Sequence, residues 1–411
     1  MKRIPAIAST VALFLASPLA AQVLWLEPSA TDLLSTRVVA PPAGGALATE
    51  AREAVSFSWA LPADRPLAAA PVPFTAESRE YWLRVSGADL GRGVRLPTTA
   101  PGALIRLSPQ PGAGGTAPRL EDIELRDAGG RSFPAGRGVA ALASAEALAA
   151  AGADFEPGTA AFLVREELGA GALTLGWAAA EPRATYIVHV FDRASKAVLR
   201  LSTNRPFYLD GDRLVLEAGI SLAGARLALE QVTGFAVSPA GRAWPLRFAR
   251  QPRGTYRAEL RLDAREAAQP GLWQVEIQAG GRRDGFEVLR NARTAFPCAV
   301  PTARFSGDVE LGKASGLSLT LGVEAATPGR YEVRGILFGT NPATGGLEPF
   351  AAAHSAAWLE TGRGVLALEV EPSILAGSHL KPPYEVRQLE LRDQGRMGLL
   401  EGRGRALVIR P

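Results

Sequence analysis

The sequence predicts an all-β protein made of three consecutive β-sandwich domains. Its 411 residues, at roughly 150 per domain, are enough for two to four domains with cores of their own. The 44 glycines and 31 prolines favour short strands and frequent turns over long helices. Apolar and polar residues alternate with a period of two in many segments, most clearly over 256–263.

Residues 1–21 have the composition of a secretory signal peptide. Lys2 and Arg3 precede an apolar run, Ile4 to Ala16, which is too short to span a bilayer comfortably, and small residues then lead to a cleavage site after Ala21. An uncut membrane anchor is the alternative interpretation. No later stretch reaches about 18 unbroken apolar residues, so we expect a periplasmic or extracellular protein with no further membrane span.

The charge pattern argues against a nucleic-acid surface. Cleavage removes Lys2 and Arg3 but no acid, which lowers the formal net charge from +4 to +2. Basic and acidic residues alternate, as over Arg257–Arg261, instead of gathering on one face. We therefore expect solvated strand faces and no nucleic-acid partner.

The first domain is expected over 22–192, with an irregular leading arm to about residue 50. One short helix is predicted over Ala140–Ala151, ended by Gly152. The alternating segments predict strands at Val55–Trp59, Tyr81–Val85, Gly102–Leu107, Leu120–Leu125, Phe162–Val164, Leu173–Trp177 and Tyr186–Phe191, the last of which could also connect to the next unit.

An immunoglobulin-like domain is expected over 193–296. The stretch Leu201–Gly219, with its turn Asp210–Asp212, is interpreted as its opening. The strands 256–263 and 273–278 are expected to form an antiparallel pair near its end, joined by a turn with Pro and Gly. Strand spacing of roughly 8–12 residues is typical of this architecture. A second immunoglobulin-like domain is expected over 297–411, where the apolar set changes sides between Val386 and Leu389 and predicts a bulge near Gln388.

No motif for catalysis or metal binding is present. The three histidines, His189, His354 and His379, have no zinc-ligand spacing between them, and the nucleophile-elbow and phosphate-loop motifs are missing. A serine triad assembled from separate loops stays open. We predict no catalytic residue, no metal ligand and no cofactor.

Polar turns are the candidate binding surfaces. We select Asp210 and Asp212, Asn341 and His379, because they lie in loops rich in Gly, Pro and polar residues, and binding residues often lie on loops held by a rigid frame. Asp210 and Asp212 offer oxygen ligands to calcium, but two carboxylates fall short of the about six to eight oxygens that calcium takes.

Cys298, the only cysteine, excludes an intramolecular disulfide. We expect it to be a small buried apolar group; a reactive thiol and a dimer link are the alternatives. Several tryptophans are expected in the core, with sugar stacking or partner anchoring as the alternative. They are Trp82, Trp177, Trp244, Trp273 and Trp358.

Several phrases of the sequence resemble one family. They are Tyr81–Ala88, Gly102–Pro109, Tyr186–Phe191, Tyr331–Gly335, His354–Leu359 and Arg392–Leu400. Together they resemble the secreted proteobacterial proteins grouped as domain of unknown function 4785, over roughly residues 50 to 411. The resemblance implies a three-part chain with immunoglobulin-like second and third parts. It implies no activity and no catalytic residue.

The expected role is binding or scaffolding at the bacterial cell envelope, with an envelope protein or a glycan as partner. Two alternatives remain: a hydrolase with its site in the first domain, where His189 lies, and a carbohydrate-binding protein. Fold class does not decide between them.

Overall fold

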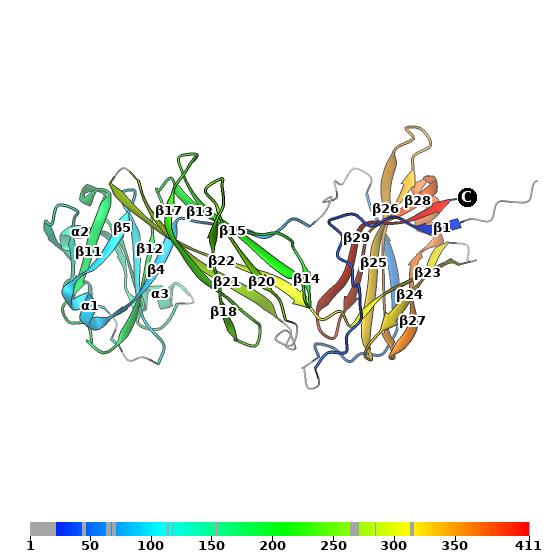
Figure 1. Cartoon of the computed structure of the whole chain (residues 1–411), viewed down its shortest axis with the longest axis horizontal. Helices are drawn as coiled ribbons and strands as arrows, with labels where there is room; N and C mark the ends of the chain where they lie inside the picture. The colour runs from blue at the N-terminus through cyan, green and yellow to red at the C-terminus, as the bar shows by residue number, and fades with distance from the viewer. Residues whose placement is uncertain are drawn as a thin grey trace, which may run out of the picture.

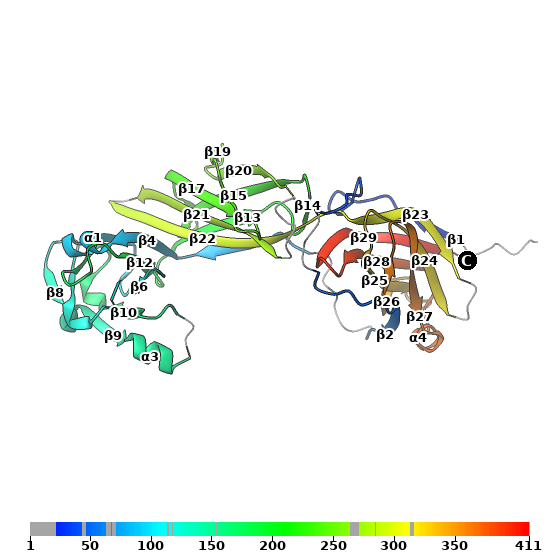
Figure 2. The ribbon, with the colours of Figure 1, turned by 90° about the horizontal axis from the view of Figure 1, so that it is seen from below.

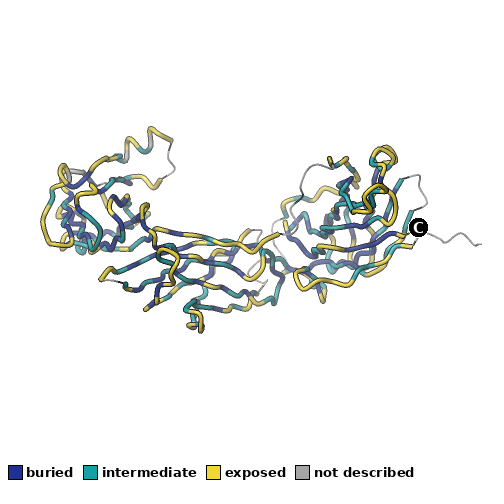
Figure 3. Tube along the Cα trace, turned by 90° about the horizontal axis from the view of Figure 1, so that it is seen from above, coloured by how far each residue is buried: buried dark blue, intermediate teal, exposed yellow. Residues whose placement is uncertain are grey.

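The computed structural model describes residues 22–42, 47–62, 67, 71–112, 115–116, 118–152, 155–263, 271–283, 285–312 and 316–410. The predicted leader, 1–21, lies outside these residues. The structure is 58% strand and 7% helical, which confirms the all-β prediction. Three β-rich bodies lie in a row (Figure 1), and in each the buried residues follow the strands (Figure 3). Among the described residues, no helix has the length and apolarity needed to cross a membrane.

The first domain packs a five-stranded sheet, β4-β12-β6-β10-β9, against a four-stranded sheet, β5-β11-β7-β8. Its core includes Tyr81, Phe162, Trp177 and Tyr186, all at most 2% exposed. The strands are β4 (Glu80–Ser86), β5 (Val94–Thr98), β6 (Leu104–Pro109), β7 (Ile123–Arg126), β8 (Ser132–Pro134), β9 (Val139–Ala143), β10 (Ala160–Val164), β11 (Gly171–Trp177) and β12 (Thr185–Phe191).

Three short helices accompany these sheets: α1 (Gly87–Arg92), α2 (Ala135–Gly138) and α3 (Ala145–Ala150). The helix predicted over 140–151 is α3, but it begins later than expected. Residues 139–143 form β9 instead, which pairs with β10. The Ala-rich composition is compatible with both helix and strand. Residues 139–143 form a strand because they pair with the otherwise open edge of β10.

The central domain is a sandwich of sheets β19-β20-β15-β13-β3 and β14-β22-β21-β17-β18, with β16 paired to β15. Trp273, Phe296 and Tyr208 fill its core. Its strands are β3 (Thr75–Ser78), β13 (Ala197–Thr203), β14 (Tyr208–Leu209), β15 (Arg213–Leu222), β16 (Ala225–Arg226), β17 (Leu229–Val237), β18 (Ala243–Pro245), β19 (Ala249–Arg250), β20 (Tyr256–Arg261), β21 (Leu272–Arg283) and β22 (Phe286–Ala299).

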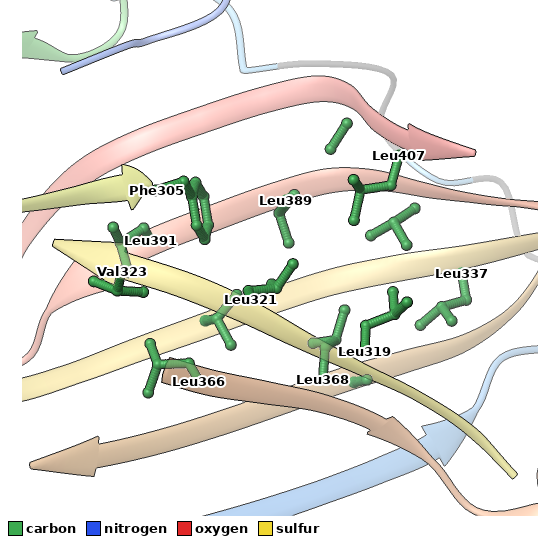
Figure 4. Close-up of a cluster of buried hydrophobic side chains, with 14 of the residues drawn as sticks. Phe305, Leu319, Leu321, Val323, Leu337, Leu366, Leu368, Leu389, Leu391 and Leu407 are labelled. Atoms are coloured by element: carbon green, nitrogen blue, oxygen red, sulfur yellow. The ribbon is translucent and has the colours of Figure 1, made fainter. Parts of the chain in front are cut away.

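The third domain packs a six-stranded sheet, β1-β29-β28-β25-β26-β2, against β23-β24-β27. Leucine and valine side chains of both sheets interdigitate in its core (Figure 4). Its elements are β1 (Gln22–Trp25), β2 (Val55–Ala60), β23 (Ala303–Leu311), β24 (Leu317–Ala325), β25 (Gly329–Thr340), β26 (Leu347–Leu359), β27 (Gly362–Val370), α4 (Pro372–Ser378), β28 (Lys381–Asp393) and β29 (Gly398–Arg410).

The predicted bulge in β28 is confirmed. Arg334 of β25 faces Glu390, whereas Ile336 faces Arg387, so two residues of β28 oppose one of β25. Gln388 lies in this bulge with a positive φ of 49°. The bulge turns the strand so that Val386 before it and Leu389 after it both enter the core.

The N-terminal segment completes domains that lie elsewhere in the sequence. β1 pairs with β29 and β2 pairs with β26, so residues expected as an arm and as the first strand of the first domain belong to the sheet of the third domain. β3 then pairs with β13 of the central domain. The alternation over Val55–Trp59 predicted a strand, but the pattern of one strand does not identify the strand with which it pairs.

β22 connects all three bodies. Fourteen residues of strand extend about 45 Å. Near its start, Leu289 packs on the core of the first domain, and at its end Ala299 packs on that of the third. One strand therefore sets how the domains sit relative to each other.

Candidate functional site

A cavity of about 420 Å³ lies where the first and central domains meet. Strands β3, β4, β6, β12 and β22 line it, and Figure 2 shows the first domain joined to the central one beside β22. We call this cavity the junction groove. The side chains that give it its chemistry are Glu80, Trp82, Arg106, His189 and Arg293.

The strand period places three of these side chains in one row. On neighbouring strands Trp82 lies opposite His189, and His189 lies opposite Arg106. Their chain neighbours, such as Tyr81 and Val190, point into the core and are fully buried. The five-stranded sheet thus has an apolar inner face and presents this row on its outer face.

His189 and Glu80 form a close pair in the groove. The distance between His189 Nε2 and Glu80 Oε2 is 2.9 Å. This hydrogen bond is the main reason why the pKa of Glu80 lies below its usual value; the nearby charges of His189, Arg106 and Arg293 lower it further, against an opposing effect of burial. Glu80 is therefore held as a carboxylate with a hydrogen-bonded partner.

Glu276 of β21 joins the two domains across the groove. Trp82 Nε1 donates to its Oε1 over 2.8 Å, and Arg293 Nε donates to its Oε2 over 2.8 Å. The Arg293 guanidinium also lies 4.3 Å from the centre of the Trp82 ring. Because Arg293 covers that ring face, Trp82 does not present it for sugar stacking.

Arg106 differs from the other charged groups of the groove. Its guanidinium lies 4.6 Å from the centre of the Phe155 ring, and it forms no ion pair within the described part of the chain. Burial lowers the pKa of Arg106, which Glu80 partly offsets. The groove therefore contains a half-buried cation whose N–H groups are available.

A second hollow, also of about 420 Å³, lies beside the groove on the outer face of the central domain. It shares Arg293 with the groove and includes Phe235, whose side chain is 40% exposed. A ligand longer than the groove would extend past Arg293 into this second hollow.

A buried ion pair fixes the two domains next to the groove. Arg290 Nη2 donates to Asp192 Oδ2 over 2.8 Å, and neither side chain is exposed. The same nitrogen donates to Ser195 Oγ over 2.7 Å, and Arg290 Nε donates to the Ala197 carbonyl over 3.1 Å. Since Arg290 precedes Arg293 on β22, and Asp192 follows β12, this pair holds two groove strands in place.

None of the four predicted binding residues lines the junction groove. Asp210 and Asp212 share a turn between the central and third domains, where Arg37 lies 3.2 Å from Asp210 and the Leu209 N–H donates to Asp212 over 2.9 Å. Among the described residues, no cluster of three or more potential metal ligands is found.

Asn341 and His379 lie on the third domain. Asn341 Oδ1 accepts from the Ala343 N–H over 2.8 Å, and its Nδ2 donates to Glu348 over 2.8 Å, so this side chain organises its own turn. His379 is exposed, in a left-handed conformation after α4.

Of the five tryptophans, Trp177 and Trp273 are core residues, at 2% and 1% exposed. Trp244 packs on Trp273 with ring centres 5.0 Å apart, and Trp358 lies under the Arg52 guanidinium, 4.4 Å away. Trp82 alone of the five lines the groove.

Sequence reasoning missed Glu80, Arg106, Glu276 and Arg293. Each is one of many charged residues on an alternating strand, and they are spread over more than 200 positions of the chain. The available signal was local: Glu80 and Trp82 share one strand face, and Glu276 shares one with Gln274 and Gln278 on β21.

The fold and the groove define a three-domain all-β protein with a polar cavity at a domain junction. Family models match three consecutive segments: the N-terminal domain of DUF4785, a domain of unknown function, over 47–192, its central domain over 195–299 and its C-terminal domain over 302–410. The chain belongs to the DUF4785 family, as its resemblance implied.

A solved structure shows the same architecture. A DUF4785 family protein from Legionella pneumophila superposes with a TM-score of 0.73 at 20% identity, covering 91% of this chain and 98% of its own. An α-2-macroglobulin from Salmonella matches 80% of this chain and 23% of its own, at 11% identity and a TM-score of 0.19, which is too low to support an argument. No curated protein matches.

Proposed function

We propose that this protein is exported and acts at the bacterial envelope as a binding protein whose ligand occupies the junction groove. The observation that carries the proposal is the groove itself, a cavity of about 420 Å³ where two domains meet and polar side chains converge. Ligand sites in proteins favour such domain junctions, with volumes of roughly 300–1,000 Å³.

Rigidity of the frame supports the proposal. The Arg290–Asp192 pair and the length of β22 hold the two walls together without any ligand. A preformed cavity loses less entropy when a ligand binds. The same frame suits a scaffold, whose partners would contact the outer faces instead.

Export is supported by the sequence of the leader, with its basic start, apolar run and small residues up to Ala21. N-terminal sequencing of the protein from a periplasmic or culture fraction tests it. The proposal expects a mature chain that starts at Gln22; an intact leader in the cytoplasmic fraction contradicts it.

Binding in the groove is tested with a matched pair of variants. Ile187 and Leu142 are aliphatic residues of the same five-stranded sheet; Ile187 lines the groove, whereas Leu142 is exposed on the edge strand β9 and does not line it. A panel of envelope glycans, peptides and small metabolites is titrated by calorimetry against the wild type, Ile187→Trp and Leu142→Trp. The proposal expects Ile187→Trp alone to remove the binding. Ligands that bind Ile187→Trp as they bind the wild type contradict it.

A hydrolase is the second candidate, because a histidine and a carboxylate lie 2.9 Å apart in the groove. Such a pair is suited to general base catalysis. His189→Ala distinguishes the two roles: an enzyme loses its turnover in hydrolase screens, while a binding protein shows none in either form.

A further inference from the structure

The junction groove contains three cationic or potentially cationic side chains, and they differ in their partners. Arg293 is bonded to Glu276, and His189 is bonded to Glu80. Arg106 has no carboxylate within ion-pairing distance among the described residues. Each acid next to the groove thus already has a partner, and one guanidinium does not.

We propose that the junction groove recognises its ligand through an oxyanion, a carboxylate or a phosphate group, held by Arg106. This inference rests on the proposed function and adds the chemical class of the ligand. A guanidinium presents parallel N–H donors whose spacing matches two oxygens of a carboxylate or phosphate.

The surroundings of Arg106 prepare it for this contact. The Phe155 ring packs 4.6 Å from the guanidinium carbon and restricts its plane. His189 lies beside it in the cross-strand row, with Trp82 beyond. Burial disfavours the charged form of Arg106 and lowers its pKa. An anion in the groove would stabilise that charge and offset the desolvation penalty.

Three acids lie near enough to oppose an anion, and each has a partner. Glu80 accepts from His189, and Glu276 accepts from both Trp82 and Arg293. Glu77 at the rim is paired with Arg200. The repulsion of an incoming oxyanion is therefore reduced, while Arg106, which Glu80 influences only from beyond ion-pairing distance, keeps its N–H donors available.

The volume of the groove sets the size of suitable probes. A cavity of about 420 Å³ takes a ligand of monosaccharide size or one end of a longer molecule. Glucuronate and glucose phosphate present a carboxylate and a phosphate on the same sugar, and glucose is the neutral match. Their comparison distinguishes a carboxylate ligand from a phosphate ligand.

The experiment is calorimetric titration of the full mature chain with the three probes. The variants are Arg106→Gln, Arg106→Lys and, as a matched control, Arg363→Gln, which changes an exposed arginine of the third domain. We expect at least one anionic probe to bind the wild type and the control equally. We expect Arg106→Gln to weaken that binding at least about tenfold, with Arg106→Lys between the two.

Three results overturn the inference: neither anionic probe binds, glucose binds as tightly as they do, or Arg106→Gln binds the anions like the wild type. The Ile187→Trp variant distinguishes failure of the oxyanion inference from failure of the proposed function. Binding of glucose that Ile187→Trp removes and Arg106→Gln retains leaves the groove as the site and rejects the oxyanion. Binding that neither variant affects rejects both.

Discussion

Arg290 and Asp192 form an ion pair of 2.8 Å in which neither side chain is exposed to solvent. Arg290 belongs to the central domain, and Asp192 directly follows the last strand of the first domain. Burial of two charges is costly unless their hydrogen bonds are satisfied, and here Ser195 and the Ala197 carbonyl bind the guanidinium as well. The pair therefore locks the orientation of two domains and, with it, the shape of the junction groove.

Replacement of this arginine tests the lock. We expect Arg290→Met to lower the free energy of unfolding by about 3–5 kcal/mol, because it removes the cation from a buried pair and leaves the Asp192 carboxyl only its hydrogen bonds from Thr99. Urea unfolding measures the change. Arg200→Met, which breaks an exposed pair with Glu77, serves as control and should cost at most about 1 kcal/mol. Equal effects of the two variants would mean that the buried pair has no special role.

The N-terminal strand should stabilise the third domain, although the two are far apart in the sequence. Trp25 of β1 packs on Phe305 with ring centres 5.4 Å apart, under the guanidinium of Arg403 at 4.5 Å. We expect Trp25→Ala to cost about 2 kcal/mol in thermal or urea unfolding, since the side chain is only partly buried. Leu24→Ala removes an exposed neighbour on the same strand and should change little. A larger loss with Leu24→Ala would contradict the observed packing.

Glu401 gives the stability a dependence on pH. Burial raises the pKa of this carboxyl from 4.5 to about 7, against the lowering effect of Arg403. The folded chain then binds a proton that the unfolded chain releases between about pH 4.5 and 7, so the contribution of Glu401 to stability falls as the pH rises through this window. Above pH 7 the deficit reaches about 3 kcal/mol at most.

Glu401→Gln removes this titration and keeps an oxygen for the Phe305 N–H. We expect the variant to be more stable than the wild type at pH 8 and to lose that advantage at pH 4.5. Unfolding by urea at both pH values measures it, with the partly exposed Glu259→Gln as control. An advantage that does not change between the two pH values would count against a buried, protonated Glu401.

Cys298 should be chemically inert in the folded protein. Its side chain is 7% exposed in the core of the central domain, and burial raises the pKa of the thiol well above its usual value. We expect Ellman's reagent to label it far more slowly in native buffer than in urea. Rapid, complete labelling of the native chain would instead favour the reactive thiol or dimer link.

The sequence predicted much of the fold because strand signals are local. The alternation over 256–263 and the shift between Val386 and Leu389 located a strand and a bulge at the positions where the structure has them. The helix α1 was missed although Ser86 and Asp89 form a capping box, because six residues carry too little periodicity.

Partners across the chain could not be predicted in the same way. Val55–Trp59 gave a correct strand, yet its pairing with β26 depends on which sheet edge is open, and one strand does not encode that. The junction groove could not be predicted for the same reason. Trp82, His189 and Arg106 are more than 20 residues from each other in sequence and meet only through strand register.

A preformed groove between two locked domains is the central claim, and a distance measurement between those domains tests it most directly. Spin labels are placed at exposed Leu142 of β9 and Glu230 of β17, after Cys298→Ala, and pulsed dipolar spectroscopy records their separation. We predict one narrow distance distribution in the absence of ligand, which broadens when Arg290→Met is added. A broad or bimodal distribution in the chain with Arg290 intact would contradict the claim.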